Sequence, residues 1–417
     1  MRDRYDVVVC GGGPGGIAAS VGAARMGLEV LLLERYGFLG GGATAMLVNP
    51  FMTYYAGGKQ IIRGVFQDMV DKLTEMGAFG SEHEPKAFDA EAFKIAAEEM
   101  GIECGVKLLY HCFLARSYVN DGKVSSIEVA TKDGLKRFEA NVFVDSTGDG
   151  DLAYFSGAVT EKGRSEDGLS QPMTLNFRMA NVDLERLPSI EEITKEYIKA
   201  KKDGIISCPR EDILYFFTTQ PGVVHFNQTR VTRYDATDPE SLTSAEIEGR
   251  RQTWEISRWL IRNIPGFENA YLQQTATQIG VRESRRVMGE YLLTAEDLLS
   301  ARRFDDVVAC GSYPIDIHNP TGEGTVLKFL EPGKWYEIPY RCLIPEGFMN
   351  LLIGGRCISA THEAHSAIRV MPIVFAIGHA AGVAAGIAAR EKVAVGEVDY
   401  RRLQDELVKQ KAFLPED

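Results

Sequence analysis

A glycine pattern near the start of the chain could bind the phosphates of a nucleotide. Gly11, Gly13 and Gly16 form a GxGxxG sequence directly after an apolar run, and Glu34 follows eighteen positions later. In such a loop, backbone N–H groups and the start of a helix hold a pyrophosphate, and an acid ending the next strand accepts hydrogen bonds from ribose hydroxyls. The spacing therefore predicts a dinucleotide site. The alternative is a structural glycine turn followed by a surface glutamate.

Later segments extend this region and suit a long ligand. Residues 37–44 supply a glycine-rich stretch with flexible backbone amides, and residues 145–151 and 354–356 each follow an apolar, strand-like run. In the first loop and the segments up to residue 151, the residues that we expect near the ligand are Gly11, Gly13, Pro14, Gly15, Gly16, Glu34, Arg35, Gly41, Gly42, Ala43, Thr44, Thr147 and Gly148.

Ionisable residues in the second half of the chain could carry out proton chemistry. Asp316 and His318 lie in the irregular segment 312–320, where a histidine can act as acid or base and an aspartate can orient it. Arg285 belongs to residues 281–286, which combine three arginines with one carboxylate and suit anionic groups. The alternatives are a structural or binding role for His318 and a structural salt-bridge cluster around Arg285.

A second ionisable group precedes the last long apolar run. His362 and His365 lie three residues apart within residues 361–369. No further ligand set accompanies them, so proton transfer or substrate anchoring by His365 is favoured and no metal is predicted. The seven cysteines include no CxxC or CxxxxC pair, so we expect reduced thiols rather than a redox dithiol or a metal cluster.

Length and composition restrict the class of protein. The 417 residues are 45% hydrophobic and 25% charged, which suits two interleaved domains of a soluble enzyme. The net charge of −12 opposes nucleic-acid binding, which needs clustered cations. No leader with a charged and an apolar region precedes the first strand, so a cytoplasmic location is expected. The apolar run 370–389 contains a proline, a histidine and glycines, which favours a buried helix over a membrane span.

The first candidate residues are positioned by a strand–turn–helix–strand unit. We expect strands at 5–10 and 28–33 around a helix at 14–26, the first half of a nucleotide-binding fold. Hydrophobic and turn patterns further predict a helix at 89–100 and strands at 106–111, 124–130, 138–140, 141–145 and 351–353.

The middle of the chain has a different sequence pattern, which predicts aromatic strands and amphipathic helices and contains no nucleotide-binding glycine motif. Ser189 with Glu192 and Thr243 with Glu246 each predict a capping box that opens a helix, the second helix running toward Ile264. We therefore expect three segments: the first part of the nucleotide-binding domain at 1–160, a substrate domain at 161–345, and the C-terminal part of the nucleotide-binding domain at 346–417.

Together these segments resemble the glutathione-reductase-type FAD superfamily. More closely, they resemble the bacterial FAD-dependent oxidoreductase family that is distantly similar to fumarate reductase flavoproteins. The resemblance covers residues 7–34, 40–50, 144–151, 280–294, 311–320, 336–345 and 351–385. It implies FAD as cofactor and an α/β fold, in which a Rossmann-like FAD-binding domain contains an inserted α+β substrate domain.

The resemblance also implies that the C-terminal segment returns to the flavin. Gly355, Arg369, Val370 and Met371 would contact the cofactor, and a helix beginning near Pro372 would direct its positive end at the flavin N1–C2=O edge. Disulfide reductases of this superfamily need a second nucleotide-binding unit and a redox cysteine pair, and residues 150–345 show neither. No motif for covalent attachment of the flavin is recognisable.

The leading functional interpretation is hydride transfer between flavin N5 and a small polar substrate, hydroxyl-bearing or carbohydrate-derived. His318 or His365 would be the base. One alternative is reduction of an activated C=C bond, with Arg285 or Arg369 binding a carboxylate or delivering a proton. Another is a non-catalytic electron-transfer flavoprotein. The sequence leaves open the electron acceptor (oxygen, quinone, nicotinamide or a partner protein) and whether the chain forms a homo-oligomer.

Overall fold

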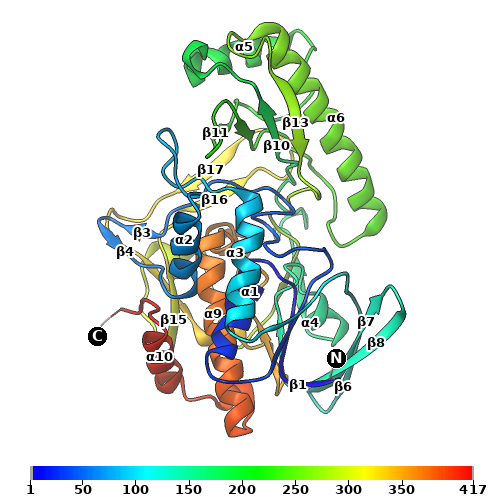
Figure 1. The fold of residues 1–417 in the computed structure, drawn as a ribbon, viewed down its shortest axis with the longest axis vertical. Coiled ribbons are helices and arrows are strands. Elements are labelled where there is room, and N and C mark those ends of the chain that lie inside the picture. Colours follow the sequence, from blue (N-terminus) through cyan, green and yellow to red (C-terminus); the bar gives the residue numbers. More distant parts are fainter. Residues whose placement is uncertain (1–2, 416–417) are drawn as a thin grey trace.

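The core of the molecule is a parallel sheet that carries the predicted nucleotide-binding unit. The computed structural model describes residues 3–415. Its parallel strands pair in the order β5, β2, β1, β8 and β19, with bounds Lys107–Leu109, Val30–Leu33, Arg4–Cys10, Gly134–Asp145 and Leu351–Ile353. The unit predicted at residues 5–33 is confirmed, and the strand predicted at 351–353 completes the same sheet (Figure 1).

One long strand connects this sheet to an antiparallel meander. The first half of β8 pairs with β7 (Lys123–Thr131), which in turn pairs with β6 (Phe113–Asn120). The second half of β8 pairs in parallel with β1 and β19. The separate strands expected at 138–140 and 141–145 are therefore wrong, because the chain passes without a turn from the Ile127–Phe138 pair to the Arg4–Glu139 pair.

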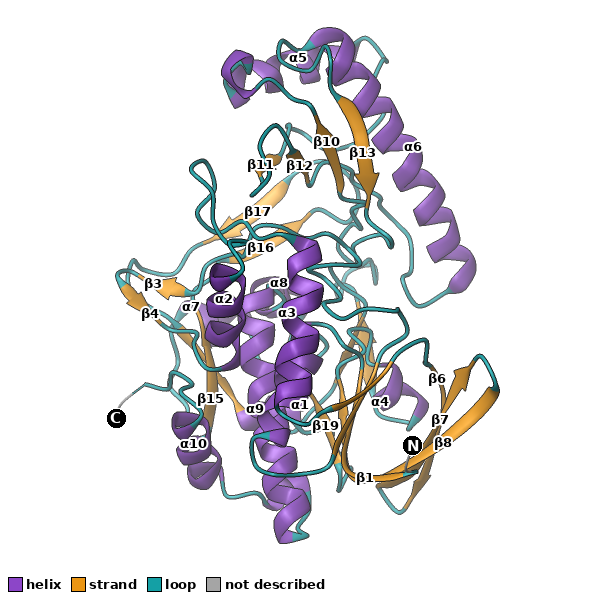
Figure 2. Cartoon of the chain, in the orientation of Figure 1, coloured by secondary structure: helices purple, strands orange, loops and turns teal. Residues whose placement is uncertain are grey.

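Helices α1 (Pro14–Ala24) and α9 (Met371–Glu391) pack against each other beside the sheet (Figures 1 and 2). Glycines allow this close contact, since a Cβ at Gly378 would lie 2.1 Å from the carbonyl oxygen of Gly15. By length and composition α9 could cross a membrane, but 94% of its most apolar stretch is buried inside the protein. The buried helix predicted from the apolar run is therefore confirmed. Helices α2 (Val65–Glu75) and α3 (Ala90–Glu103, capped by Asp89) cover the same side.

A second body with its own apolar core lies at one end of the molecule (Figure 1, green). Its sheet has the order β11, β12, β10 and β13, with bounds Tyr215–Phe217, Val224–Phe226, Phe177–Ala180 and Tyr271–Thr275. Helices α5 (Ile190–Lys202) and α6 (Pro239–Asn263) cover one face of it. Apolar residues from Val287 to Ile344 belong instead to the main core. The change in packing therefore lies near residue 281, within the segment expected to end at 345.

The two predicted capping boxes have different outcomes. The Ser189 hydroxyl accepts the backbone N–H of Glu192, and the Glu192 carboxylate accepts the backbone N–H of Ser189. The first box is therefore confirmed. The second is wrong: α6 begins earlier, with Asp238 as N-cap and Pro239 in the first turn, and the Thr243 hydroxyl donates to the Pro239 carbonyl at 2.7 Å. Proline at the first helical position and an aspartate before it are the stronger start signal.

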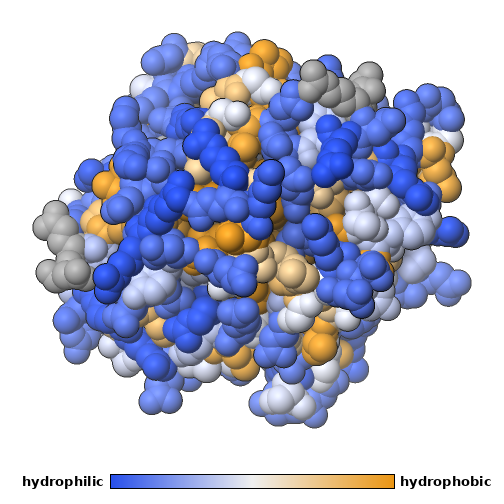
Figure 3. Space-filling view, turned by 90° about the horizontal axis from the view of Figure 1, so that it is seen from below, coloured by the Kyte–Doolittle hydropathy of each residue, from blue (hydrophilic) through white to orange (hydrophobic). Residues whose placement is uncertain are grey.

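The remaining elements surround these two bodies. Short antiparallel pairs are β3–β4 (Tyr55–Ala56, Lys59–Gln60), β9–β14 (Thr160–Lys162, Arg285–Val287), β15–β18 (Val307–Gly311, Tyr336–Pro339) and β16–β17 (Ile315–His318, Thr325–Lys328). The other helices are α4 (Asp151–Phe155), α7 (Ala295–Leu299), α8 (His362–Ile368), α10 (Tyr400–Lys409) and 3-10 turns at Leu184–Arg186, Tyr340–Leu343 and Val395–Glu397. The face opposite the second body is mostly hydrophilic, with apolar groups scattered over it (Figure 3).

Candidate functional site

Three cavities follow one another past the carboxyl ends of the parallel strands. The first and second share Gly11, Glu34 and Arg35 in their walls. The second and third share Gly42, Met46, Arg356, Arg369 and Met371. The shared residues make one continuous binding region, which begins beside β1 and β2 and ends between the main and second bodies. Ligands of open α/β sheets bind at this edge of the sheet.

Glu34 forms the polar side of the first cavity. Its buried carboxylate accepts the backbone N–H of Gly12 at 2.7 Å and that of Tyr36 at 2.9 Å. Burial raises the pKa of Glu34, and these two hydrogen bonds partly oppose the rise. Each carboxylate oxygen can accept more than one hydrogen bond, so Glu34 remains able to bind ribose hydroxyls. The apolar side, which the sequence reasoning missed, is lined by Cys10, Leu33, Cys112, Leu114 and Val129.

The start of α1 provides the donors of the second cavity. Gly13 is the N-cap, and no side chain caps the helix, so its first amides are available to a ligand. Gly11 has a φ of +98°, which favours glycine, and a Cβ at Gly15 would lie 1.9 Å from the Gly354 carbonyl oxygen. These glycines bring the helix start next to the loop after β19. A pyrophosphate fits this arrangement of backbone donors and helix dipole.

Some of the expected cofactor residues serve packing instead. A Cβ at Gly16 would lie 1.7 Å from the carbonyl oxygen of Gly11, so this glycine allows the helix to approach the strand. The hydroxyl of Thr44 donates to the Leu39 carbonyl, and Ala43 is fully buried. These three residues do not line the three cavities, whereas Gly11, Gly13, Pro14, Gly15, Arg35, Gly41, Gly42, Thr147, Gly148, Gly355, Arg369 and Met371 line the second.

The second helix start in the region belongs to α9. Val370 is its N-cap, with no side-chain cap, and Pro372 lies in the first turn, as expected for a helix beginning there. Met371 lies in the walls of both the second and third cavities, and Val370 in that of the third. An uncapped helix start of this kind suits the electron-rich edge of a flavin.

The third cavity lies between the two bodies, and the empty space within it, counted together with its opening to solvent, is about 860 Å³. The main body contributes Gly42, Met46, Val48, Asn49, Pro50, Met52, Tyr313, Asp316, His318, Arg356, Arg369, Val370 and Met371. The second body and the strand that follows it contribute Thr174, Asn176, Asn227, Gly280, Val281 and Arg282. The structure thus brings Asp316 and His318, which the sequence singled out, to the cavity next to the cofactor region.

Asp316 is the only carboxylate in the wall of the third cavity. The Tyr313 hydroxyl donates to Asp316 at 2.8 Å, and Arg369 and His318 lie 3.5 and 3.6 Å from its oxygens. Burial raises the pKa of Asp316, but the nearby imidazole of His318, the charge of Arg369 and the hydrogen bond from Tyr313 outweigh it. The net pKa lies below the usual value, so this carboxylate is ionised at neutral pH.

His318 is neutral and has partners at both ring nitrogens. Burial, followed by the nearby charge of Arg282, lowers its pKa to about 3. Arg230 lies 3.2 Å from Nδ1, and Nε2 faces Asp316. Because arginine has only donors, Nδ1 accepts and Nε2 carries the proton. The Nε2 proton of His318 is therefore directed toward Asp316, 3.6 Å away, and the Nδ1 lone pair that a base would use faces Arg230.

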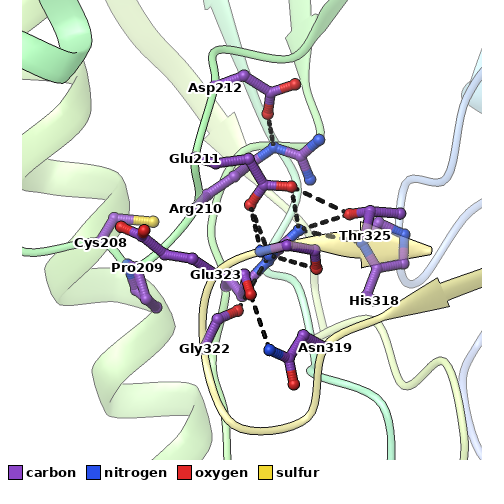
Figure 4. Close-up of polar contacts among 12 residues, drawn as sticks. Cys208, Pro209, Arg210, Glu211, Asp212, His318, Asn319, Gly322, Glu323 and Thr325 are labelled. Carbon is purple, nitrogen blue, oxygen red and sulfur yellow. Dashed lines mark hydrogen bonds and ion pairs between the residues drawn. The ribbon is translucent and has the colours of Figure 1, made fainter.

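A clamp from the second body holds the hairpin that carries these residues (Figure 4). Glu211 accepts from the Thr325 hydroxyl at 3.1 Å and from the backbone of Gly324 at 3.2 Å. It also pairs with Arg230 at 2.7 Å. Since β16 and β17 pair directly, fixing Thr325 also fixes His318 on the opposite strand.

Two of the candidate catalytic residues lie elsewhere. Arg285 points away from the third cavity: its guanidinium pairs with Asp151 at 2.8 Å and lies over the Tyr154 ring. His365 is buried in α8, does not line the cavity, and has a pKa lowered well below its usual value by burial. Arg282, three positions before Arg285, does line the third cavity.

Residues 3–415 contain no group of three or more His, Cys, Asp or Glu side chains placed to hold a metal ion. His362, considered as a ligand, has its Nδ1 2.9 Å from Glu283, which also pairs with Arg286 in a buried network. All seven cysteines are free thiols.

Comparison with known proteins identifies the cofactor as FAD. A family model described as FAD dependent oxidoreductase matches residues 6–407. Over 156 residues, which are 35% of its length, this chain is 29% identical to thiamine thiazole synthase of Methanococcus aeolicus. Over a stretch of the same length it is 30% identical to digeranylgeranylglycerophospholipid reductase 1 of Methanopyrus kandleri. The matches span 55% and 40% of those proteins, and the chain spans about half the length or less of the curated relatives it matches.

A likeness of fold extends over nearly the whole chain. The flavin-dependent brominase Bmp2, solved as a triple mutant, superposes with a TM-score of 0.51 at 14% identity, covering 98% of this chain and 86% of that one. At this identity the likeness shows the fold alone, an α/β FAD-binding fold with a parallel-sheet core.

Proposed function

The chain belongs to the family of FAD-dependent oxidoreductases, and we propose that it transfers hydride between FAD and a small polar substrate bound in the third cavity. FAD is the cofactor, and the enzyme is an oxidoreductase. In finer terms, we propose a glutathione-reductase-type FAD-binding domain whose inserted segment covers the flavin. The hydroxyl-bearing or carbohydrate-derived class remains our leading candidate substrate.

The third cavity is the observation that carries this proposal. It adjoins the cofactor region through Gly42, Arg356 and Met371, and the second body closes it with Thr174 and Asn227. Polar groups converge on it from both bodies, as expected for a site that orients a polar substrate.

We propose that Asp316 receives the hydrogen bond of a substrate hydroxyl and takes its proton. Its ionised carboxylate lines the cavity, the Tyr313 hydroxyl donates to it at 2.8 Å, and Nε2 of His318 faces it at 3.6 Å. Bound FAD supplies the two-electron redox centre at its N5 position. His318 is then a positioning residue that keeps the carboxylate oriented, and Arg230 fixes its tautomer.

The second candidate function is reduction of an activated C=C bond. It is favoured by the two guanidinium groups, Arg282 and Arg369, that face a single carboxylate in the cavity wall. Such cations bind a conjugated carboxylate and stabilise negative charge that develops during reduction.

Anaerobic stopped-flow measurement of flavin bleaching tests the proposal. The FAD-loaded enzyme is mixed with a panel of alcohols, hydroxy acids and sugars, and the photoreduced enzyme is mixed with ketones and enoates. Bleaching by hydroxyl compounds, slowed in Asp316→Asn but not in Arg285→Met, supports dehydrogenation. Reoxidation by enoates alone supports the second candidate. If no compound changes the flavin spectrum in either direction, the non-catalytic electron-transfer interpretation replaces both.

A further inference from the structure

Arg282 is a partly buried cation in the wall of the third cavity, and it has no carboxylate partner. Its Nη1 donates to the Pro172 carbonyl at 2.8 Å and to the Thr174 hydroxyl at 2.6 Å, and its Nη2 donates to Asn227 Oδ1 at 3.1 Å. All three acceptors are neutral. Within residues 3–415, no carboxylate oxygen lies in ion-pair contact with this guanidinium.

The surrounding charges do not compensate Arg282. Besides Asp316, the charges that act on it belong to three further arginines, Arg369, Arg210 and Arg230. Asp316 is itself in contact with Arg369, and Arg230 pairs with Glu211. Removing an unpaired cation even partly from water costs free energy, and a counter-charge that binds beside it offsets that cost. The arrangement therefore favours an anion beside Arg282.

The position of Arg282 favours the substrate over the pyrophosphate of the cofactor as that anion. Arg356 and Arg369 line both the second and third cavities, whereas Arg282 lines only the third. It follows the bridge between Gly280 and Thr174, so it is held on the wall formed by the second body.

The balance of charges in the wall of the third cavity favours a substrate group with a single negative charge. Arg282 and Arg369 face one ionised carboxylate, Asp316, while Arg356 is paired with Asp149 at 2.7 Å and His318 is neutral. One positive charge in the wall is therefore uncompensated. The planar fork of a guanidinium also matches a carboxylate through two parallel hydrogen bonds.

We propose that Arg282, held by Thr174 and Asn227, binds a carboxylate group of the substrate. This inference rests on the proposed function and narrows its substrate to a small carboxylic acid with a reactive group near Asp316. Three of the five guanidinium N–H donors are used by the protein, which leaves donors for a carboxylate. The side-chain oxygens of Asn227 and Thr174 accept from the guanidinium and fix its orientation.

Ligand binding to the FAD-loaded enzyme, measured without turnover, tests the inference. Acetate and propionate are titrated while the flavin difference spectrum and the melting temperature are recorded, with acetamide and propionamide as neutral isosteres. Wild-type enzyme is expected to bind the carboxylates at least about tenfold more tightly than the amides, the difference expected for one charge-assisted hydrogen-bond pair. Arg282→Met is expected to abolish that preference.

The matched control is Arg285→Met, which removes an arginine three positions away that does not line the cavity. It is expected to keep the wild-type preference. Arg282→Lys, which retains the charge, is expected to recover part of the preference for carboxylates. It also provides the comparison with wild type if Arg282→Met fails to fold. Equal binding of carboxylates and amides to wild-type enzyme overturns the inference, as does an unchanged preference in Arg282→Met. Tighter binding of inorganic phosphate than of acetate overturns the assignment of a carboxylate.

This experiment separates the inference from the proposed function. Arg282-dependent binding of acetate without bleaching by any compound supports the carboxylate site and overturns hydride transfer. Bleaching by uncharged alcohols, with no preference for carboxylates, supports hydride transfer and overturns the carboxylate site.

Discussion

Arg230 and His318 come from different bodies of the molecule, yet Nη2 of the arginine lies 3.2 Å from Nδ1 of the histidine. The contact fixes which nitrogen of the imidazole carries the proton, because a guanidinium can only donate. It also couples the second body to the strand that carries Asp316. The protonation state of the site thus depends on how the two bodies meet.

The buried neutral state of His318 predicts a loss of stability in acid. Its folded pKa of about 3 lies below the ordinary value of 6.5, so between these values the unfolded chain binds more protons. The contribution is fully present above pH 6.5 and is lost as the pH falls toward 3. Urea unfolding at several pH values should show a shallower decline for His318→Gln than for wild type. Parallel curves for the two proteins would mean that His318 is not buried neutral.

Removing the Glu34 carboxylate should weaken FAD binding by ~1–3 kcal/mol, the amount expected for charge-assisted hydrogen bonds. Flavin fluorescence titration of Glu34→Ala measures the loss. Glu34→Gln is the control: it keeps the volume of the side chain and one carbonyl acceptor while removing the charge. Flavin affinity that is unchanged in the alanine variant would exclude Glu34 from the ribose site.

Alanine at two glycines of the first loop should give two different defects. A Cβ at Gly15 would lie 1.9 Å from the Gly354 carbonyl oxygen, whereas one at Gly13 would lie 3.8 Å from its nearest neighbour, an ordinary contact. Gly15→Ala should therefore destabilise the protein by about 1–3 kcal/mol or more, as overpacking does. Gly13→Ala should keep its melting temperature without cofactor but lose affinity for FAD. A destabilised Gly13→Ala together with a Gly15→Ala of wild-type stability would contradict the packing described for α1.

Arg369→Met should lower the flavin midpoint potential. Two-electron reduction adds negative charge to the cofactor, and Arg369 lines both cavities in which the flavin is expected to lie. A shift on the order of 30 mV corresponds to about 1.4 kcal/mol for a two-electron couple. Spectroelectrochemical titration measures it, with Arg285→Met as the control for loss of a cation outside the cavities. If both variants keep the wild-type potential, Arg369 does not act on the flavin.

The cofactor half of the site was predictable because it depends on local sequence. The spacing of Gly11, Gly13 and Gly16 and the acid at Glu34 are properties of one continuous unit, and the structure places them together. The glycines that pack α1 against the sheet could not be separated from those that line the cavity, since both fit the same pattern.

The substrate half was less predictable because it depends on pairing between distant segments. Arg282 reaches the cavity, and Arg285 does not, because the bridge between Gly280 and Thr174 and the β9–β14 pair send them in different directions. Asn227 carried no signal in the sequence, since a lone polar residue directly after a short strand has many explanations. His365 stood in a suggestive run, but α8 buries it.

The close packing of α1 against α9 has a consequence for biosynthesis. The pyrophosphate cavity takes residues from both ends of the chain, including Gly355, Arg369 and Met371, and β19 is the last strand of the sheet. A nascent polypeptide that has emerged from the ribosome only as far as residue 350 has the glycine loop but not the opposite wall. Cofactor loading must then wait until most of the chain has been translated, and premature termination leaves an apoprotein with an exposed α1.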